Sequence, residues 1–159
     1  MNRRIFLLAT PLLALAGCGF RLRGVNAMPF TSAWVEAGEG SLIGQQLREQ
    51  LHNQRKLHAG SKNAPLVIRL SQEKLDKQIL SLSGAGRVRE YRLSYEVQMD
   101  VRDAYGKTLL GAIPLFTQRD LTYDDNQALA KEAEEANLRR DMAIELARQA
   151  LTRIAHGRL

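Results

Sequence analysis

The sequence predicts an α+β fold, a two-layer α/β roll in which two helices pack on a four-stranded mixed or antiparallel sheet. The first supporting observation is a strict alternation of apolar and polar side chains from Tyr91 to Arg102, typical of a strand with one packed and one solvated face. The second is an apolar stripe at helical spacing from Leu129 to Ile154. The third is the order of the expected elements, β-α-β-β-β-α, for which two layers are the natural arrangement.

A short strand and a helix open the domain. Residues 33–37 form a plausible strand, and Ser41 offers an N-cap for a helix that continues to about Asn53. The apolar residues of this helix gather on one side, namely Leu42, Ile43, Leu47 and Leu51. Gly44 should weaken the helix by roughly 1 kcal/mol relative to alanine.

The next two apolar stretches are expected to belong to one long strand. Residues 66–70 alternate as a strand does, and an apolar pattern resumes at Ile79 after a polar interval at 71–78. A long, twisted strand with a bulge accounts for both stretches, and a break within the interval is the alternative. Ser83-Gly84-Ala85-Gly86 is then a clear turn signal.

A hairpin follows the alternating strand. Residues 103–107 are its expected loop, in which Gly106 can take a positive φ. The return strand extends from Thr108 to about Tyr123. Pro114 lacks a backbone N–H, so it indicates an edge position or a bulge in that strand.

A long helix is predicted after Asp124-Asp125-Asn126, where side-chain capping and negative charge both suit a helix start. Its expected central apolar stripe consists of Leu129, Ala133, Ala136, Ala143, Ala147, Ala150 and Ile154. Leu138, Met142 and Leu146 widen the stripe on one side, and Ile144 and Leu151 on the other. The expected solvent side carries Glu134, Asp141, Glu145, Arg148 and Thr152. Packing on the sheet is the expected use of the stripe, and contact with a partner is the alternative.

The first 17 residues have the anatomy of a secretory signal. Arg3 and Arg4 precede an apolar run at 5–16, and small residues stand before Cys18, the single cysteine of the chain. Leu15-Ala16-Gly17-Cys18 resembles the lipobox of bacterial lipoproteins. That resemblance implies cleavage before Cys18, a diacylglycerol on its thiol and an acyl chain on its new amine. A buried or unpaired thiol in an ordinary secreted protein is the alternative.

We therefore expect three parts: a removed lipoprotein signal peptide at 1–17, a lipidated tether at 18–32 and a single periplasmic α/β domain at 33–159. Three acyl chains would anchor the protein permanently, because each buried methylene adds about 0.8 kcal/mol. Gly19 is not the aspartate that retains many such lipoproteins at the inner membrane, so the outer membrane is the expected location. Apart from the lipid on Cys18, no cofactor is expected.

Bulk composition narrows the choice of partners. A chain of 159 residues suits one domain, and its formal net charge of +6 would fall by two on cleavage. This mild excess favours acidic partners such as phosphorylated lipid, or is an ordinary solubility charge. Nucleic acid is not expected as a partner, because the sequence has no dense basic run with interleaved aromatic residues.

The sequence offers no catalytic constellation. His52, His58 and His156 lack companions at metal-ligand spacing, and no serine lies in a Gly-x-Ser-x-Gly context. We therefore expect neither a metal site nor an enzyme.

A basic cluster beside the 83–86 turn is the strongest candidate site. Arg87-Val88-Arg89-Glu90, with Arg92 after it, would place cations at a hairpin tip, where they can bind phosphate or carboxylate. The alternative is a charged loop that prevents edge-to-edge aggregation.

Three short segments resemble the LPS-assembly lipoprotein LptE family, known also as the rare-lipoprotein-B family. They are Cys18-Gly19-Phe20-Arg21-Leu22-Arg23-Gly24, Glu90-Tyr91 at the opening of the alternating strand, and Gln127-Ala128-Leu129-Ala130-Lys131 at the start of the last helix. The order of elements is similar as well. The resemblance implies a plug domain inside the lumen of a large outer-membrane β-barrel, LptD, which it helps to assemble. It also implies binding of lipopolysaccharide.

The resemblance also implies which residues contact lipopolysaccharide. Lys131 stands in the motif whose lysine is implicated in the family. The other implicated basic residue of the family lies in the hairpin before Glu-Tyr, where this chain has Gly84-Ala85-Gly86, with Arg87 and Arg89 slightly later. A solvated lysine in the first helical turn is the alternative for Lys131. For the whole chain, the alternative is a freestanding membrane-tethered ligand-binding lipoprotein, which predicts a concave apolar pocket between helices and sheet.

Overall fold

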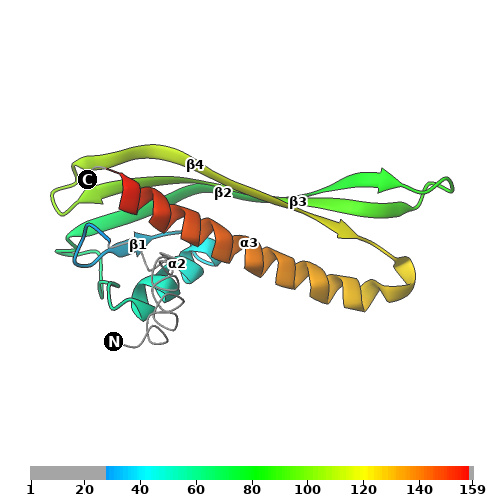
Figure 1. Cartoon of the computed structure of the whole chain (residues 1–159), viewed down its shortest axis with the longest axis horizontal. Coiled ribbons are helices and arrows are strands. Elements are labelled where there is room, and N and C mark those ends of the chain that lie inside the picture. Colours follow the sequence, from blue (N-terminus) through cyan, green and yellow to red (C-terminus); the bar gives the residue numbers. More distant parts are fainter. Residues whose placement is uncertain (1–27, 158–159) are drawn as a thin grey trace, which may run out of the picture.

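Two helices lie on one face of a long, twisted four-stranded sheet in the computed structural model, which describes residues 28–157 (Figure 1). The elements follow the predicted order: β1 (Trp34–Glu36), α2 (Leu42–Asn53), β2 (Leu66–Leu82), β3 (Val88–Asp103), β4 (Thr108–Thr122), a 3₁₀ turn η1 (Asp125–Gln127) and α3 (Ala128–His156). The predicted two-layer α+β roll is confirmed. Cys18 and the rest of 1–27 lie outside the described residues.

The sheet is mixed and has the order β1-β2-β3-β4. β1 pairs with β2 in parallel over only three residues, whereas β2, β3 and β4 form long antiparallel pairs. β2 remains one strand through three register shifts, and Gln72 at the first of them has a φ of +52°. The prediction of one long strand with a bulge is therefore confirmed. Pro114 lies in β4, an edge strand, as its missing N–H requires.

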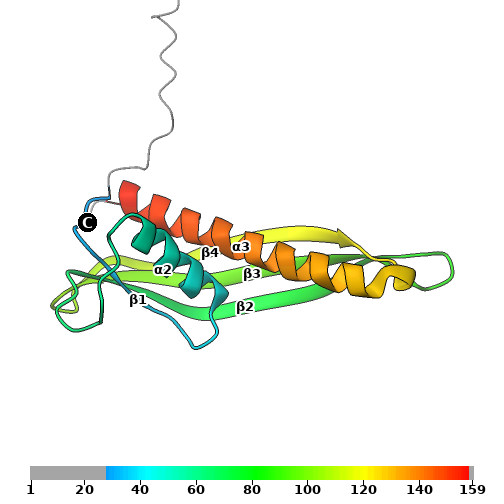
Figure 2. The ribbon, with the colours of Figure 1, turned by 90° about the horizontal axis from the view of Figure 1, so that it is seen from below.

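The hydrophobic core lies where both helices meet the sheet. The alternating strand supplies one wall of it, with Leu93, Tyr95, Val97, Met99 and Val101 all buried. α2 adds Ile43, Leu47 and Leu51 from the facing layer. α2 lies beside only the second half of α3 (Figure 2), so the core fills one end of the domain and the long β2–β3 hairpin extends beyond it.

The first turn of α2 forms as the sequence predicts. The Ser41 side chain accepts a hydrogen bond of 2.9 Å from the Gly44 N–H and so caps the helix. Gly44 is buried on the core side, and a Cβ added there would lie 2.6 Å from the Ala37 Cβ. The missing side chain of Gly44 therefore allows the chain after β1 to pass close to α2. The low helix propensity of glycine does not by itself reveal this packing role.

Gly44→Ala is expected to destabilise the domain although alanine is the better helix former. The added methyl group must displace Ala37 or the capping Ser41, and overpacking of this kind costs about 1–3 kcal/mol, which exceeds the roughly 1 kcal/mol gained in propensity. Urea denaturation measures the difference. Gly60→Ala is the control, because an added Cβ there meets open space, and a Gly44→Ala variant as stable as wild type would contradict the packing argument.

The start of α3 differs from the prediction. The Asp124 side chain accepts from the Asn126 N–H and so caps η1, while α3 itself begins after Gln127 without a side-chain cap. The predicted central stripe is correct from Ala143 onward, but its first three members, Leu129, Ala133 and Ala136, are exposed. Of the residues expected to widen the stripe, Met142 is buried and Leu138 packs partly against the core. The first three members are exposed because α2 is short. Gln50 of α2 donates a hydrogen bond to the Ile144 carbonyl, in the second half of α3. Within residues 28–157, no second helix lies beside the first half of α3 to cover its apolar side chains.

Candidate functional site

The β2–β3 turn and the start of α3 carry the predicted site residues, and both lie at the same end of the molecule (Figure 1). The β2–β3 turn is held by hydrogen bonds from the Ser83 N–H to the Arg87 carbonyl (2.7 Å) and from the Arg87 N–H to the Ser83 hydroxyl (3.1 Å). The Tyr123 N–H donates to the Arg89 carbonyl at 2.7 Å, which ties the exit of β4 to the base of this turn. η1 and α3 follow at once, so Lys131 lies at the same end as Arg87 and Arg89.

The three predicted cations differ in their surroundings. Arg87 and Arg89 are exposed, and within residues 28–157 neither takes part in an ion pair. Lys131 has a side chain only 18% exposed, and its Nζ lies 2.9 Å from Glu134 Oε2. The two arginines can therefore bind an anion directly, whereas Lys131 must first release the Glu134 carboxylate.

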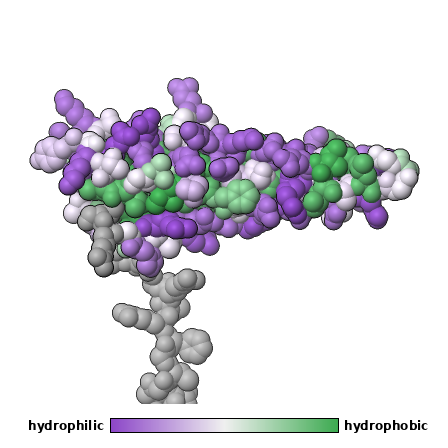
Figure 3. All heavy atoms as spheres, turned by 90° about the horizontal axis from the view of Figure 1, so that it is seen from above, coloured by the Kyte–Doolittle hydropathy of each residue, from purple (hydrophilic) through white to green (hydrophobic). Residues whose placement is uncertain are grey.

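An exposed aliphatic cluster, which the sequence pattern did not reveal, lies beside these arginines. Ile79 is 57% exposed, Leu80 40% and Leu82 55%, all within the last four residues of β2. The register shift between Ile79 and Ser81 lies inside the cluster and disturbs the alternation of faces there. Figure 3 shows an apolar patch at this end of the molecule. We call residues 79–89 the hairpin end; it combines exposed aliphatic side chains with exposed cations.

A polar cluster joins the first half of α3 to the sheet. Lys77 Nζ of β2 lies 2.6 Å from Glu135 Oε2 of α3, and Arg139 holds the other oxygen of the same carboxylate. Lys77 also lies over the Tyr91 ring, 4.1 Å from its centroid. Burial of Glu135 acts to raise its pKa, but the Lys77 hydrogen bond and the Arg139 charge outweigh burial, so the pKa lies below its ordinary value of 4.5.

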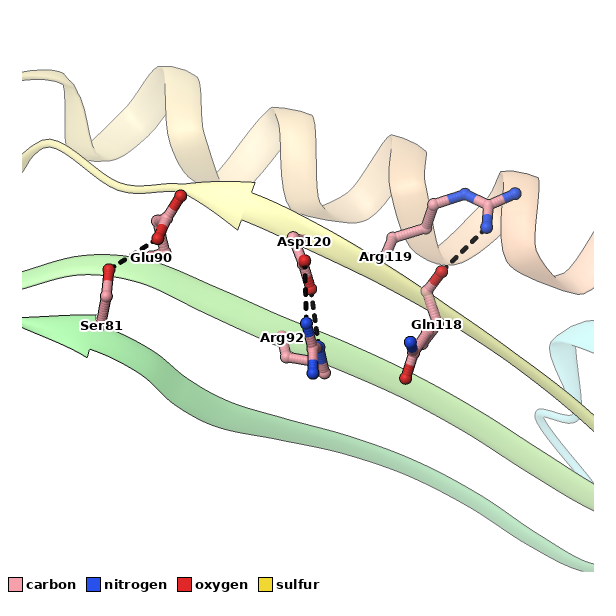
Figure 4. A network of polar contacts seen from close by, with 6 residues as sticks. All are labelled: Ser81, Glu90, Arg92, Gln118, Arg119 and Asp120. Atoms are coloured by element: carbon pink, nitrogen blue, oxygen red, sulfur yellow. Dashed lines mark hydrogen bonds and ion pairs between the residues drawn. The ribbon is translucent and has the colours of Figure 1, made fainter.

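The sheet face opposite the helices is polar, as the alternating pattern predicts. Arg92 and Asp120 form two hydrogen bonds of 2.8 and 3.0 Å across β3 and β4, and the Ser81 hydroxyl donates to Glu90 (Figure 4). The hydrogen bond from Arg92 lowers the pKa of Asp120. Phe116 is a large apolar side chain exposed on this face, opposite Glu96 in the register. The face therefore offers charged and hydrogen-bonding groups along most of its length.

A surface hollow of about 410 Å³ lies at the rim of the core, between the loop before α2 and the first bulge of β2. Tyr95 forms part of its wall: its hydroxyl accepts from the Ile43 N–H at 3.2 Å and donates to Glu73. Burial and the hydrogen bond to Glu73 raise the pKa of Tyr95. The hydroxyl thus supplies a partner for one of the free N–H groups at the start of α2.

Tyr95→Phe is expected to lower the free energy of unfolding by about 1–2 kcal/mol, because it leaves the buried Ile43 N–H without a partner. Chemical denaturation gives the value. Tyr105→Phe is the control, since that ring is 95% exposed. A loss no larger than that of the control would show that the Ile43 N–H finds another acceptor.

Two features are absent from residues 28–157. No helix among them is long and apolar enough to cross a membrane. No three histidine, cysteine, aspartate or glutamate side chains in this part of the chain gather as they would around a metal ion.

Comparison with known proteins decides the family. The model of the family described as "LptE: Lipopolysaccharide-assembly" matches residues 23–154. The chain belongs to the LptE family. The LPS-assembly lipoprotein LptE of Photorhabdus laumondii is 32% identical over 160 residues, which cover 94% of this chain and 84% of the relative. This LptE-family chain is thus a cell-envelope lipoprotein of lipopolysaccharide assembly.

Solved structures share the LptE fold. The solution structure of an uncharacterized lipoprotein B from Nitrosomonas europaea is 33% identical, with a TM-score of 0.71 over 86% of this chain and 90% of that one. The crystal structure of the rare lipoprotein B from Shewanella oneidensis is 26% identical, with a TM-score of 0.66 over 78% and 93% of the two chains. The roll found here is therefore shared with lipoproteins from two other organisms.

Proposed function

We propose that this LptE-family protein is an outer-membrane lipoprotein that plugs and assembles the β-barrel LptD and binds lipopolysaccharide during its insertion into the outer leaflet. The observation that carries the proposal is the hairpin end, where the exposed cations Arg87 and Arg89 adjoin the exposed aliphatic side chains of Ile79, Leu80 and Leu82. Neither group alone would suffice, because surface cations and single exposed leucines are common on proteins.

The hairpin end matches the chemistry of a phosphorylated lipid. Guanidinium groups bind phosphate oxygens through strong, charge-assisted hydrogen bonds. Exposed aliphatic side chains gain free energy when acyl chains cover them. We assign Arg87, Arg89 and Lys131 as the lipopolysaccharide-binding residues, with Lys131 joining the two arginines after it releases Glu134.

The opposite face of the sheet supports the plug role. The interior of a large outer-membrane barrel is polar, so a domain inside it needs a polar surface. The Arg92–Asp120 and Arg102–Asp100 pairs lie on strands of this long sheet and leave many groups free to bond a polar wall. The elongated shape in Figure 1 suits a lumen, since it presents a large area of sheet along one axis.

The remaining parts of the proposal concern the N-terminus. Cleavage would remove residues 1–17, acylation of Cys18 would anchor the chain, and residues 18–32 would connect the anchor to a periplasmic domain at 33–159. No cofactor beyond the diacylglycerol and N-acyl chain is proposed. An aqueous plug domain needs such an anchor to remain at its membrane, and three acyl chains supply it.

Affinity purification from outer membranes tests the proposed function. A tagged, full-length chain is expected to recover a large heat-modifiable β-barrel together with lipopolysaccharide, and Cys18→Ala is expected to leave the chain outside the outer-membrane fraction. Recovery of a monomer without a barrel would favour the alternative, a freestanding ligand-binding lipoprotein. In that case a small molecule should occupy the hollow beside Tyr95, which mass spectrometry of the native protein would detect.

A further inference from the structure

The first half of α3 is attached to the sheet in an unusual way. None of the residues from 128 to 141 is fully buried, although the second half of the helix buries seven side chains. Leu138 packs partly against the core. Before Leu138, the partly buried positions of the helix are Ala128, Lys131 and Glu135, so no large apolar side chain packs there, while Leu129 points into solvent and is 84% exposed.

We infer that Glu135, Lys77 and Arg139 form a clamp that positions Lys131 relative to the hairpin end for lipopolysaccharide binding. The inference rests on the proposed function. Glu135 is only 13% exposed, and its one carboxylate holds a cation of β2 and a cation of α3 together. Arg139 Nε is buried and has no hydrogen-bond partner among the described residues, so the guanidinium is held through its contact with Glu135.

The clamp reaches the hairpin end through aromatic rings. Lys77 is sandwiched between its ion pair and the Tyr91 ring, and Tyr91 meets Tyr123 edge-to-face with centroids 5.3 Å apart. Tyr123 is also the residue whose N–H binds the Arg89 carbonyl. The same set of contacts therefore fixes the strand that carries Arg89 and the helix that carries Lys131.

The position of Lys131 follows from helix geometry. Lys131 and Glu135 are four residues apart, so their side chains are neighbours on one face of α3. Fixing Glu135 against β2 therefore fixes Lys131 one turn earlier, facing the sheet rather than solvent. Without the clamp, the turns before Leu138 would keep only weak contacts with the sheet, and Lys131 would sample many positions at a cost in binding entropy.

Four variants of the full-length lipoprotein, purified in detergent, separate this role from ordinary stability: Glu135→Gln, Glu132→Gln, Lys77→Glu, and a double exchange of Lys77 and Glu135. Glu135→Gln keeps the shape of the side chain and removes its charge. Glu132→Gln is the matched control, because Glu132 is exposed on the same helix and has no ion pair within residues 28–157. The double exchange Lys77→Glu with Glu135→Lys reverses the charges of the pair and tests for rescue.

Hydrogen exchange and binding of purified lipopolysaccharide are the two measurements. Glu135→Gln is expected to speed exchange at 128–137 by about tenfold while 142–156 stays protected, and to weaken lipopolysaccharide binding by roughly fivefold or more. Glu132→Gln should change neither quantity. Lys77→Glu alone should behave as Glu135→Gln does, and the double exchange should recover at least half of the lost affinity.

Other results would overturn the inference. Unchanged exchange at 128–137 in Glu135→Gln would show that no clamp holds the helix. Faster exchange with unchanged affinity would show that the clamp does not position Lys131, and a double exchange without recovery would show that the charge pair is not the cause. A wild-type chain that binds no lipopolysaccharide would overturn the proposed function itself, which the variants alone do not test.

Discussion

Leu146→Ala is expected to lower the free energy of unfolding by about 2–5 kcal/mol, because Leu146 is fully buried and its removal leaves a cavity in the core. Leu129→Ala, the same substitution in the same helix, is expected to change stability by no more than about 0.5 kcal/mol, because Leu129 is exposed. Urea denaturation of the two variants measures both values. The pair tests the orientation of α3 along its length.

The comparison has a clear contrary outcome. If the stripe predicted from the sequence were continuous, Leu129 would be buried and both variants would lose comparable stability. A large loss in Leu129→Ala would therefore contradict the structure of the first half of α3. Met142→Ala, at the first fully buried position of the helix, should resemble Leu146→Ala and serves as a second reference.

Reversing Arg87 and Lys131 together to glutamate is expected to weaken lipopolysaccharide binding by roughly 100-fold at low salt. A hydrogen bond to a charged group contributes about 1.5–3 kcal/mol, and each 1.4 kcal/mol corresponds to a factor of ten. The difference should shrink as salt screens the charges. Titration of purified lipopolysaccharide at several ionic strengths gives both results, with melting temperature as the check on folding.

A matched double reversal controls for net charge. Lys62 and Lys107 are exposed, have no ion pair within residues 28–157, and lie near the opposite end of the sheet, where Leu66 pairs with Asp103. Lys62→Glu with Lys107→Glu should bind lipopolysaccharide nearly as wild type does. Equal losses in the two double variants would mean that total charge, and not the hairpin end, determines binding.

Local patterns predicted most of the fold because each pattern has one physical cause. The alternation from Tyr91 to Arg102 followed from one buried and one solvated sheet face, and Ser41 capped α2 because its hydroxyl meets a free N–H. The turn at Gly86 and the loop at Gly106 have φ values of +77° and +82°, which glycine permits. Each of these features depends on residues that are close together in the sequence, so each can be predicted from the sequence.

The errors and omissions depend on distant parts of the chain. Leu129 is exposed because α2 does not extend beside the first half of α3. The length of α2 cannot be read from the sequence around Leu129. Gly44 was assigned a cost in propensity, while its close approach to Ala37 was not visible in the helical pattern. Similarly, the Glu135–Arg139 pair lies at helical spacing and can be read from the sequence, whereas the contact between Glu135 and Lys77 crosses 58 residues and cannot.

The candidate site was predicted in part. Arg87, Arg89 and Lys131 were selected from short motifs, and the structure places them at one end of the molecule; their role in binding stays a prediction. The aliphatic half of the hairpin end was missed, although Ile79, Leu80 and Leu82 were noted as a strand pattern. Their exposure could have been suspected, because the helices are too short to cover the full length of the sheet.

Site-specific photocrosslinking in cells tests the central claim most directly, namely that the hairpin end faces lipopolysaccharide. A photoreactive residue is placed at Ala85, in the β2–β3 turn, or at Tyr105, in the β3–β4 loop at the other end of β3; both positions are exposed. The account predicts a lipopolysaccharide adduct at Ala85 and little or none at Tyr105. Equal adducts at the two positions, or an adduct at Tyr105 alone, would contradict it.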